Sequence, residues 1–183
     1  MSLVPVPDTL ETDRLILRHS RVDDAAIYRQ LWTERDPRVP PHRRISSEGR
    51  PTVEDIAARI RAERAEPGPG PGPGLLAVER KDMADVIGYC GLIFHGPGSP
   101  AEPAEPELAY ELLRGAHGRG YATEAGLAVV AWAGEAGYGR LWAGVRDWNV
   151  ASRRVLEKLG FRETGQVECD AVHGDSLLTV REF

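Results

Sequence analysis

The stretch E-L-A-Y-E-L-L-R-G-A-H-G-R-G-Y-A-T-E-A at 107–125 predicts a strand that runs into a glycine turn and then into a helix. Gly118 and Gly120 let the backbone approach a ligand closely and take a positive φ at little cost. The helix, expected to open near Ala122 and Thr123, leaves its first N–H groups without partners inside the helix. These groups and the helix dipole favour an anion, as in a cradle for a phosphorylated cofactor. A G-x-G turn also occurs in units that bind nothing, so the turn alone leaves both interpretations open.

The length and composition of the chain fit one soluble globular domain. Its 183 residues are enough to bury a core, so we expect a single domain over 1–183. No apolar run approaches the roughly 20 residues that span a membrane, and the N-terminus lacks the basic start and apolar core of a secretory signal. We therefore expect a cytoplasmic protein without a membrane partner. The net charge of −5 argues against nucleic acid as the main partner and suits a cationic amine substrate.

The two cysteines, Cys90 and Cys169, form neither a disulfide framework nor a metal-binding spacing. Free cysteines without such a spacing usually pack as small hydrophobic residues. We therefore interpret both as buried thiols in a reducing cytosol, and we expect no metal.

Hydrophobic periodicity predicts strands and helices along the whole chain. Strands are expected at 10–18, 75–80, 86–94, 107–113, 141–145, 162–169 and 176–182. Helices are expected after the caps Asp23 and Asp24, at a capping box of Thr52 and Asp55, at 123–138 and after Asn149. Loops rich in proline are expected at 67–74 and 96–106. This order indicates an α/β sandwich with helices on both faces of the sheet.

Two of the expected helices carry more detailed predictions. In the helix at 123–138, the spacing of Leu127, Val130 and Ala131 predicts one shared inward face. The last helix is expected to end at Gly160 in the left-handed conformation. Phe161 should then pack back onto Leu156, which is the usual contact of a Schellman motif.

Three segments in this order resemble the GNAT superfamily of acyl-CoA-dependent N-acyltransferases. They read T-L-E-T-D-R-L-I-L-R at 9–18, H-G-R-G-Y-A-T-E-A at 117–125 and N-V-A-S-R-R-V-L-E-K-L-G-F at 149–161. The closest resemblance is to the branch of the ribosomal-protein N-terminal acetyltransferases (RimJ/RimL-like). It implies a mixed, mostly antiparallel central sheet of six to seven strands, splayed at strands 4 and 5, with helices on both faces. It also implies acetyl-CoA as co-substrate and an amine as acceptor.

The resemblance assigns cofactor contacts to the glycine turn and its neighbours. The pantetheine arm would lie between the strands ending at Leu113 and Val145 and pair with the backbone of Leu112, Leu113 and Arg114. The pyrophosphate would rest on the amides of His117, Gly118, Arg119, Gly120, Tyr121, Ala122 and Thr123. Amides near Leu113 would polarise the thioester carbonyl, in the manner of an oxyanion hole. Asn149 would bond the pantetheine chain or, alternatively, cap the next helix.

The resemblance also points to candidate catalytic residues. Many members have a tyrosine, the general acid for the leaving thiolate, where this chain has Leu156. Ser152, one turn earlier, could protonate or bond the thiolate, or it could cap the helix. Glu107 matches a position that acts as general base in some members, and Glu111 lies on the same strand face. A solvated or ion-paired carboxylate is the alternative for both.

Two classes of function remain open from the sequence. The first is an N-acetyltransferase that transfers the acetyl group of acetyl-CoA to a protein N-terminus or a small-molecule amine by direct attack in a ternary complex. The second is a non-catalytic acyl-CoA-binding sensor, which the loss of tyrosine at Leu156 favours. Tyr28, Trp32, Tyr89 and Phe94 either line an acceptor pocket or pack in the core. The final strands offer a possible edge for a homodimer.

Overall fold

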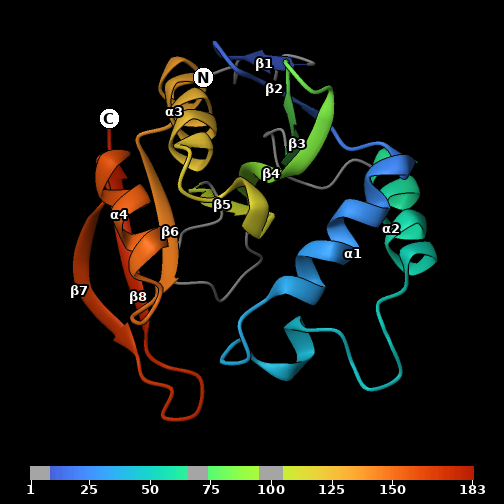
Figure 1. Ribbon diagram of the computed structural model, residues 1–183. Coiled ribbons are helices and arrows are strands. Elements are labelled where there is room, and N and C mark those ends of the chain that lie inside the picture. The colour runs from blue at the N-terminus through green and yellow to red at the C-terminus, as the bar shows by residue number, and fades with distance from the viewer. Residues whose placement is uncertain (1–8, 66–73, 95–104) are drawn as a thin grey trace.

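The computed structural model describes residues 9–65, 74–94 and 105–183, and its strands form one sheet (Figure 1). The strands are β1 (Thr9–Glu11), β2 (Leu15–His19), β3 (Leu75–Arg80), β4 (Asp85–Ile93), β5 (Glu107–Leu112), β6 (Arg140–Arg146), β7 (Arg162–Glu168) and β8 (Ser176–Glu182). Their order is β1-β2-β3-β4-β5-β6-β8-β7. Only β5 and β6 pair in parallel, and all other neighbours are antiparallel. The predicted α/β class and mixed sheet are confirmed, but the sheet has eight strands and not six or seven.

The additional strand comes from a turn inside the segment expected as one strand at 10–18. The Thr12 hydroxyl accepts a hydrogen bond from the Leu15 amide at 2.9 Å, and the Thr12 amide donates to the Leu15 carbonyl at 3.0 Å. These bonds reverse the chain, so β1 folds back antiparallel on β2. Leu15 and Leu17 still share one face, and both are fully buried as predicted.

The sheet opens between β5 and β6. These strands pair only at Glu107 and Trp142, next to the bond from the Trp142 amide to the Pro106 carbonyl at 3.0 Å. Beyond that point the two strands diverge. The opening lies between the two segments predicted to splay. These segments were expected as strands 4 and 5, and they are β5 and β6 because β1 is an additional strand.

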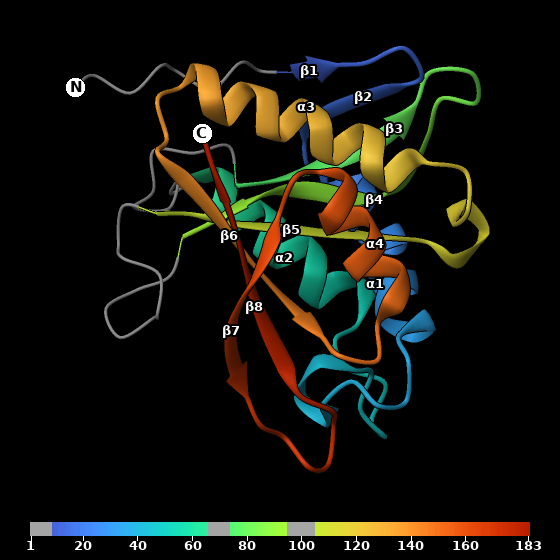
Figure 2. The same cartoon turned by 90° about the vertical axis from the view of Figure 1, so that its left-hand side faces the viewer.

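Helices cover both faces of the sheet. They are α1 (Ala25–Glu34), α2 (Val53–Ala65), α3 (Tyr121–Glu135) and α4 (Val150–Lys158). Figures 1 and 2 show α1 and α2 together on one side of the sheet and α3 on the other. The helix α4 packs on α3, where the Leu159 side chain fills the space beside Gly126. The main core lies between the sheet and the pair α3–α4, and a smaller core joins α1 to α2.

The helix termini agree with the sequence at two predicted features and differ from it at a third. Thr52 and Asp55 form the reciprocal capping box, with bonds of 2.8 and 3.1 Å. Gly160 has φ +82° and the Phe161 amide donates to the Leu156 carbonyl at 2.9 Å, which confirms the Schellman motif. Asp24 precedes α1 but does not cap it through its side chain. Its carboxylate instead accepts two bonds from the buried Arg18 guanidinium.

Two burial predictions are wrong. On α3 the inward face is formed by Ala125, Val129, Val130 and Ala133, while Leu127 is 49% exposed. Ala131 is exposed too, because alanine-rich helices give weak hydrophobic contrast between their faces. Cys90 is buried, but Cys169 is exposed, since it follows the edge strand β7.

The predicted proline-rich loops at 67–74 and 96–106 lie almost entirely outside the described residues. Within the parts of the chain that the structure describes, no helix combines the length and apolar character needed to cross a membrane.

Candidate functional site

A cavity of about 840 Å³ lies between the end of β5, the start of α3 and one face of α4. It brings together most of the residues predicted for the cofactor: Leu112, Arg114, His117, Gly118, Gly120, Tyr121, Ala122, Thr123, Asn149 and Ser152. Leu113 and Arg119 do not line it. Of the predicted catalytic residues, Glu111 and Ser152 line the cavity and Glu107 does not.

The glycine turn leaves the start of α3 open toward this cavity. Gly118 and Gly120 have φ of +73° and +79°, so both need the left-handed conformation that glycine favours. Gly120 occupies the N-cap position and provides no side-chain cap for the helix amides. A Cβ added at Gly118 would meet nothing within 4 Å. An uncapped helix start beside open space fits the diphosphate of a nucleotide cofactor.

A carboxylate in the first turn of α3 is neutralised by the N-terminal segment. Glu124 accepts hydrogen bonds from the Thr12 hydroxyl at 2.6 Å, the Arg14 amide at 3.0 Å and the Arg14 Nε at 2.7 Å. Burial raises the pKa of the Glu124 carboxyl, but the bonds from Thr12 and Arg14 outweigh it and hold the pKa below its usual value. Arg14 also donates to the Arg119 carbonyl at 3.1 Å. The segment 9–18 thus fixes the turn and masks a charge that would repel a phosphate.

The backbone of 112–114 is partly engaged within the protein. The Leu113 amide donates to the Ile87 carbonyl at 2.8 Å, and the Arg114 amide donates to the Glu34 carboxylate at 2.7 Å. The His117 ring lies 2.8 Å from the Leu112 carbonyl. Since successive amides of a strand point to opposite edges, the Leu112 amide faces the opening between β5 and β6. The sequence did not indicate Glu34, which comes from the far end of α1.

One side of the cavity carries a pair of hydroxyl groups. The Tyr110 hydroxyl lies 2.7 Å from the Ser152 Oγ and 3.1 Å from the Ser152 carbonyl. Burial raises the pKa of the Tyr110 phenol to about 12. Asn149 accepts a bond from the Ser152 amide at 3.2 Å, so it does cap α4. Ser152 lies inside the helix and is not its cap, and Tyr110 is a neighbour that the sequence reading missed.

The other side of the cavity contains an ion pair on the opposite face of β5. Glu111 accepts two bonds from Arg35, at 2.8 and 2.6 Å, and a third from the Tyr89 hydroxyl at 2.8 Å. The Arg35 guanidinium lies 4.3 Å from the centre of the Trp32 ring. Burial raises the pKa of Tyr89, which keeps it a phenol donor. Glu111 is therefore an ion-paired carboxylate at the cavity wall. Trp32 and Tyr89 contact this ion pair but do not line the cavity.

Glu107 lies where the opening between the strands begins. Its Oε1 accepts a hydrogen bond from the Gly144 amide at 3.1 Å, which connects β5 to β6. Four residues separate it from Glu111 along β5, so the two carboxylates lie at different depths of the opening.

A loop after α1 reaches across to the turn before α4. The Arg38 guanidinium lies 4.1 Å from the centre of the Trp148 ring and forms a two-bond pair with Asp36. Bonds from Arg38 lower the pKa of Asp36 to about 2. The Trp148 indole donates to the His173 carbonyl at 2.7 Å. Asp36 and Trp148 both line the cavity, so this contact closes one of its ends.

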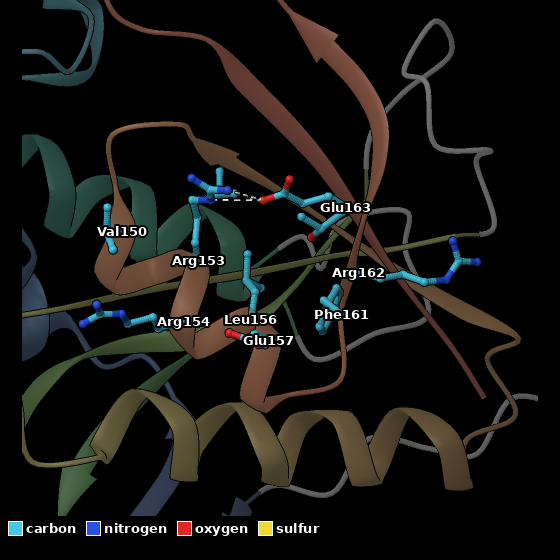
Figure 3. A pocket seen from close by; sticks show the side chains of 10 residues that line it. Val150, Arg153, Arg154, Leu156, Glu157, Phe161, Arg162 and Glu163 are labelled. Carbon is cyan, nitrogen blue, oxygen red and sulfur yellow. Dashed lines mark hydrogen bonds and ion pairs between the residues drawn. The ribbon is translucent and has the colours of Figure 1, made fainter.

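A second cavity, of about 460 Å³, lies on another face of α4 (Figure 3). Leu156 and Phe161 of the Schellman motif line it, and the ion pair of Arg153 with Glu163 crosses its rim. None of the predicted site residues lines this cavity. Leu156 thus lines this second cavity and not the main one, and it is only 3% exposed.

Two cationic side chains of α4 were missed by the sequence reading. Arg154 and Lys158 line the main cavity together with Ser152. Helical spacing could have found them, because residues 151, 154, 155 and 158 share one face. Within the described ranges, no group of three His, Cys, Asp or Glu residues could hold a metal ion.

Comparisons with known proteins agree with this arrangement. Residues 14–162 match the family model described as an acetyltransferase (GNAT) domain. The curated N-acetyltransferase p20 of Bacillus licheniformis, described as uncharacterized, is 27% identical over 167 residues, covering 86% of this chain and 84% of that protein. A solved structure described as a GNAT-family acetyltransferase from Bordetella pertussis has a TM-score of 0.73 at 25% identity and covers 96% of this chain and 99% of the other. The ribosomal-protein-S5-alanine acetyltransferase of Vibrio fischeri has a TM-score of 0.61 at 18% identity and covers 95% of this chain and 96% of the other.

Proposed function

Because this chain belongs to the GNAT acetyltransferase family, we propose that it transfers the acetyl group of acetyl-CoA to a primary amine by direct attack in a ternary complex. One observation carries the proposal. The start of α3 has Gly120 at its N-cap position and therefore no side-chain cap, and it opens into a cavity that Ser152 and Glu111 also line. This supports a single site that would hold the cofactor and the groups for the chemistry together.

Each part of the cavity has a task in this proposal. The amides of His117, Gly118, Arg119, Gly120, Tyr121, Ala122 and Thr123 hold the diphosphate, helped by the cations of Arg114, Arg154 and Lys158. The Leu112 amide, which faces the strand opening, stabilises charge on the thioester oxygen. The backbone of Leu112, Leu113 and Arg114 and the side chain of Asn149 serve the pantetheine arm. When bound, acetyl-CoA supplies the activated acetyl group.

The base remains a choice between two carboxylates. We infer that Glu111 is the better candidate, because it lines the cavity while Glu107 does not. Arg35 and Tyr89 already donate hydrogen bonds to both of its oxygens, so in the proposal the proton of the ammonium reaches Glu111 through water. Glu107 stays a candidate at the start of the opening, with the Gly144 amide as one of its partners.

The acceptor and the branch of the family are proposed from the sequence resemblance. The three segments at 9–18, 117–125 and 149–161 favour the RimJ/RimL-like branch, in which the acceptor is a protein N-terminus. A small-molecule amine is the second possibility. We also propose that residues 1–183 form one catalytic domain, that it works in the cytoplasm, and that of the two final strands β7, which lies at the edge of the sheet, offers the surface for a homodimer. No nucleic acid, membrane or metal has a part in the proposal.

The test is release of CoA thiol from acetyl-CoA with a panel of small amines and N-terminal peptides. The exposed Cys169 would react with a thiol reagent, so the assay uses a Cys169→Ser variant and blanks without acceptor. Burial raises the pKa of the Cys90 thiol to about 12, so we expect that thiol not to react with the reagent. Turnover with one acceptor class would support the enzyme and name its substrate. Tight acetyl-CoA binding with no turnover on any acceptor would instead favour the sensor that Leu156 suggested.

A further inference from the structure

The hydroxyl pair of Tyr110 and Ser152 joins two elements across the opening of the sheet. Tyr110 comes from β5 and Ser152 from α4, and both line the main cavity. Their side chains are partly buried, and their oxygen atoms lie 2.7 Å apart. A bond this short between hydroxyl groups is well formed. It lies on the same face of β5 as the buried Leu108 and Leu112, which is the face of the glycine turn.

Counting protons shows what the pair can do. The phenol has one proton and two acceptors in reach, the Ser152 Oγ and the Ser152 carbonyl. If the phenol donates to the carbonyl, the serine proton must point at the phenol oxygen. If the phenol donates to Oγ, the serine proton is free to point into the cavity. Both states need the same heavy-atom positions, so changing between them costs no rearrangement of the backbone.

A serine near the start of a helix otherwise has competing uses for its proton. Serine hydroxyls in helices commonly donate back to a carbonyl of the preceding turn. A phenol that donates to Oγ leaves this proton to an acceptor in the cavity. The position of Tyr110 therefore decides whether Ser152 can act as a donor there.

We propose that Tyr110 is a positioning residue, which directs the Ser152 proton at the departing sulfur so that the pair stabilises the thiolate by hydrogen bonding. The inference rests on the proposed function. As the amine nitrogen bonds to the carbonyl carbon, it loses a proton through water to the base, for which Glu111 is the better candidate, while the C–S bond breaks and the sulfur keeps its electron pair. The pair donates a hydrogen bond to that sulfur and does not give up a proton.

The pKa values of the thiol and the phenol agree with a hydrogen bond to the sulfur and not with proton transfer. A thiol has a pKa of about 8.5, whereas the Tyr110 phenol has a pKa of about 12. A proton would therefore leave the phenol for the sulfur only at an energetic cost, while a hydrogen bond is favourable. This also accounts for Leu156: it faces the other cavity, and the hydroxyl at the main cavity comes from Ser152 instead.

The decisive experiment is a pH titration of bound CoA, followed by the ultraviolet absorbance of its thiolate. It uses the Cys169→Ser protein and compares wild-type residues with Tyr110→Phe, Ser152→Ala and Ser152→Thr. The other titratable or charged groups that line the cavity all stay unchanged: Glu34, Arg35, Asp36, Glu111, Arg114, His117, Tyr121, Arg154 and Lys158. Cys90, directly opposite Tyr110 on β4, also stays unchanged. Tyr138→Phe is the matched control, because its buried hydroxyl has no hydrogen-bond partner among the described residues.

We expect the thiol of bound CoA to ionise at a lower pH than free CoA in the parent protein. Tyr110→Phe and Ser152→Ala should both move that ionisation back toward free CoA, while Ser152→Thr and Tyr138→Phe should not. The rate constant kcat should fall about tenfold in each of the first two, as for one lost bond to a charged group. The double variant Tyr110→Phe with Ser152→Ala should have the same kcat as Ser152→Ala alone.

The outcomes separate this inference from the proposed function. If the parent protein binds no CoA, both are wrong. If it binds CoA but Tyr110→Phe leaves both the thiol ionisation and kcat unchanged, only the inference is overturned. It is also overturned if the losses of the two single variants multiply in the double variant, since Tyr110 would then act independently of Ser152.

Discussion

The two faces of β5 are built in different ways. On one face, Tyr110 and Leu112 look toward a cradle made by the turn that follows the strand directly. On the other face, Glu111 meets Arg35, which is 76 residues away in the chain. The cradle depends on backbone conformation and on small residues. The opposite wall depends on charged side chains that only the folded chain brings together.

The cradle face offers the largest expected effect. Gly118→Glu should weaken CoA binding by more than a hundredfold, because it strains a left-handed residue and adds a negative charge in the phosphate site. Titration calorimetry with CoA measures the effect. Gly139→Glu is the control, since that exposed glycine has open space and no positive φ. Equal affinity of the Gly118 variant and the control would show that the turn is not the phosphate site.

The wall face should respond in stability more than in cofactor affinity. Arg35→Met leaves the Glu111 carboxylate, whose side chain is 24% exposed, without its cation. We expect a loss of about 3 kcal/mol in the free energy of unfolding, measured in urea, with nearly unchanged CoA binding. The double variant Arg35→Met with Glu111→Leu should recover much of it. A larger loss in the double variant than in the single one would contradict the ion-pair account.

An intermediate effect is expected at the cation that masks Glu124. Arg14→Gln should weaken CoA binding about three- to tenfold, because the first turn of α3 then presents a negative charge to the phosphates. Adding Glu124→Gln should restore most of the affinity. Calorimetry at low and high salt measures both, and the defect should shrink as salt screens the charge. If Glu124→Gln fails to rescue, Arg14 acts by shaping the turn and not by neutralisation.

The smallest effect should come from Asp36 at the end of the wall. Its pKa in the folded protein is about 2, below the ordinary value of 3.8, because Arg38 donates to it. The pair therefore adds stability above about pH 4 that is lost as the pH falls toward 2. Since the pair is near the surface and screened by solvent, the gain should be small. In thermal melts, Asp36→Asn should fall slightly below the parent protein at pH 6, and the difference should shrink as the pH falls through about 2.

The same contrast explains what the sequence could predict. The glycine turn and the Schellman motif at Gly160 depend on local pattern, whereas the strand opening was implied by the family resemblance, and the structure confirms all of these. Three residues contribute through contacts with residues far away in the chain, so no local spacing could predict them: Arg14, Glu34 and Arg35. Tyr110 lies on the strand face opposite Glu111, as alternation along a strand requires, but its partner Ser152 is brought to it only by the docking of α4. Leu127 and Ala131 were misplaced because an alanine-rich helix has little contrast between its faces.

The single residue pair between β5 and β6 has a consequence for how the molecule opens. Backbone hydrogen bonds along the other strand pairs tie β1 to β5 and β6 to β8 into two blocks. Among the residues that the structure describes, only Glu107 with Trp142 continues the ladder between these blocks. Amide exchange should therefore find two cooperative units of unequal protection that separate along this line. The main cavity lies where the two blocks meet, so a ligand that contacts both blocks would slow amide exchange in both at once.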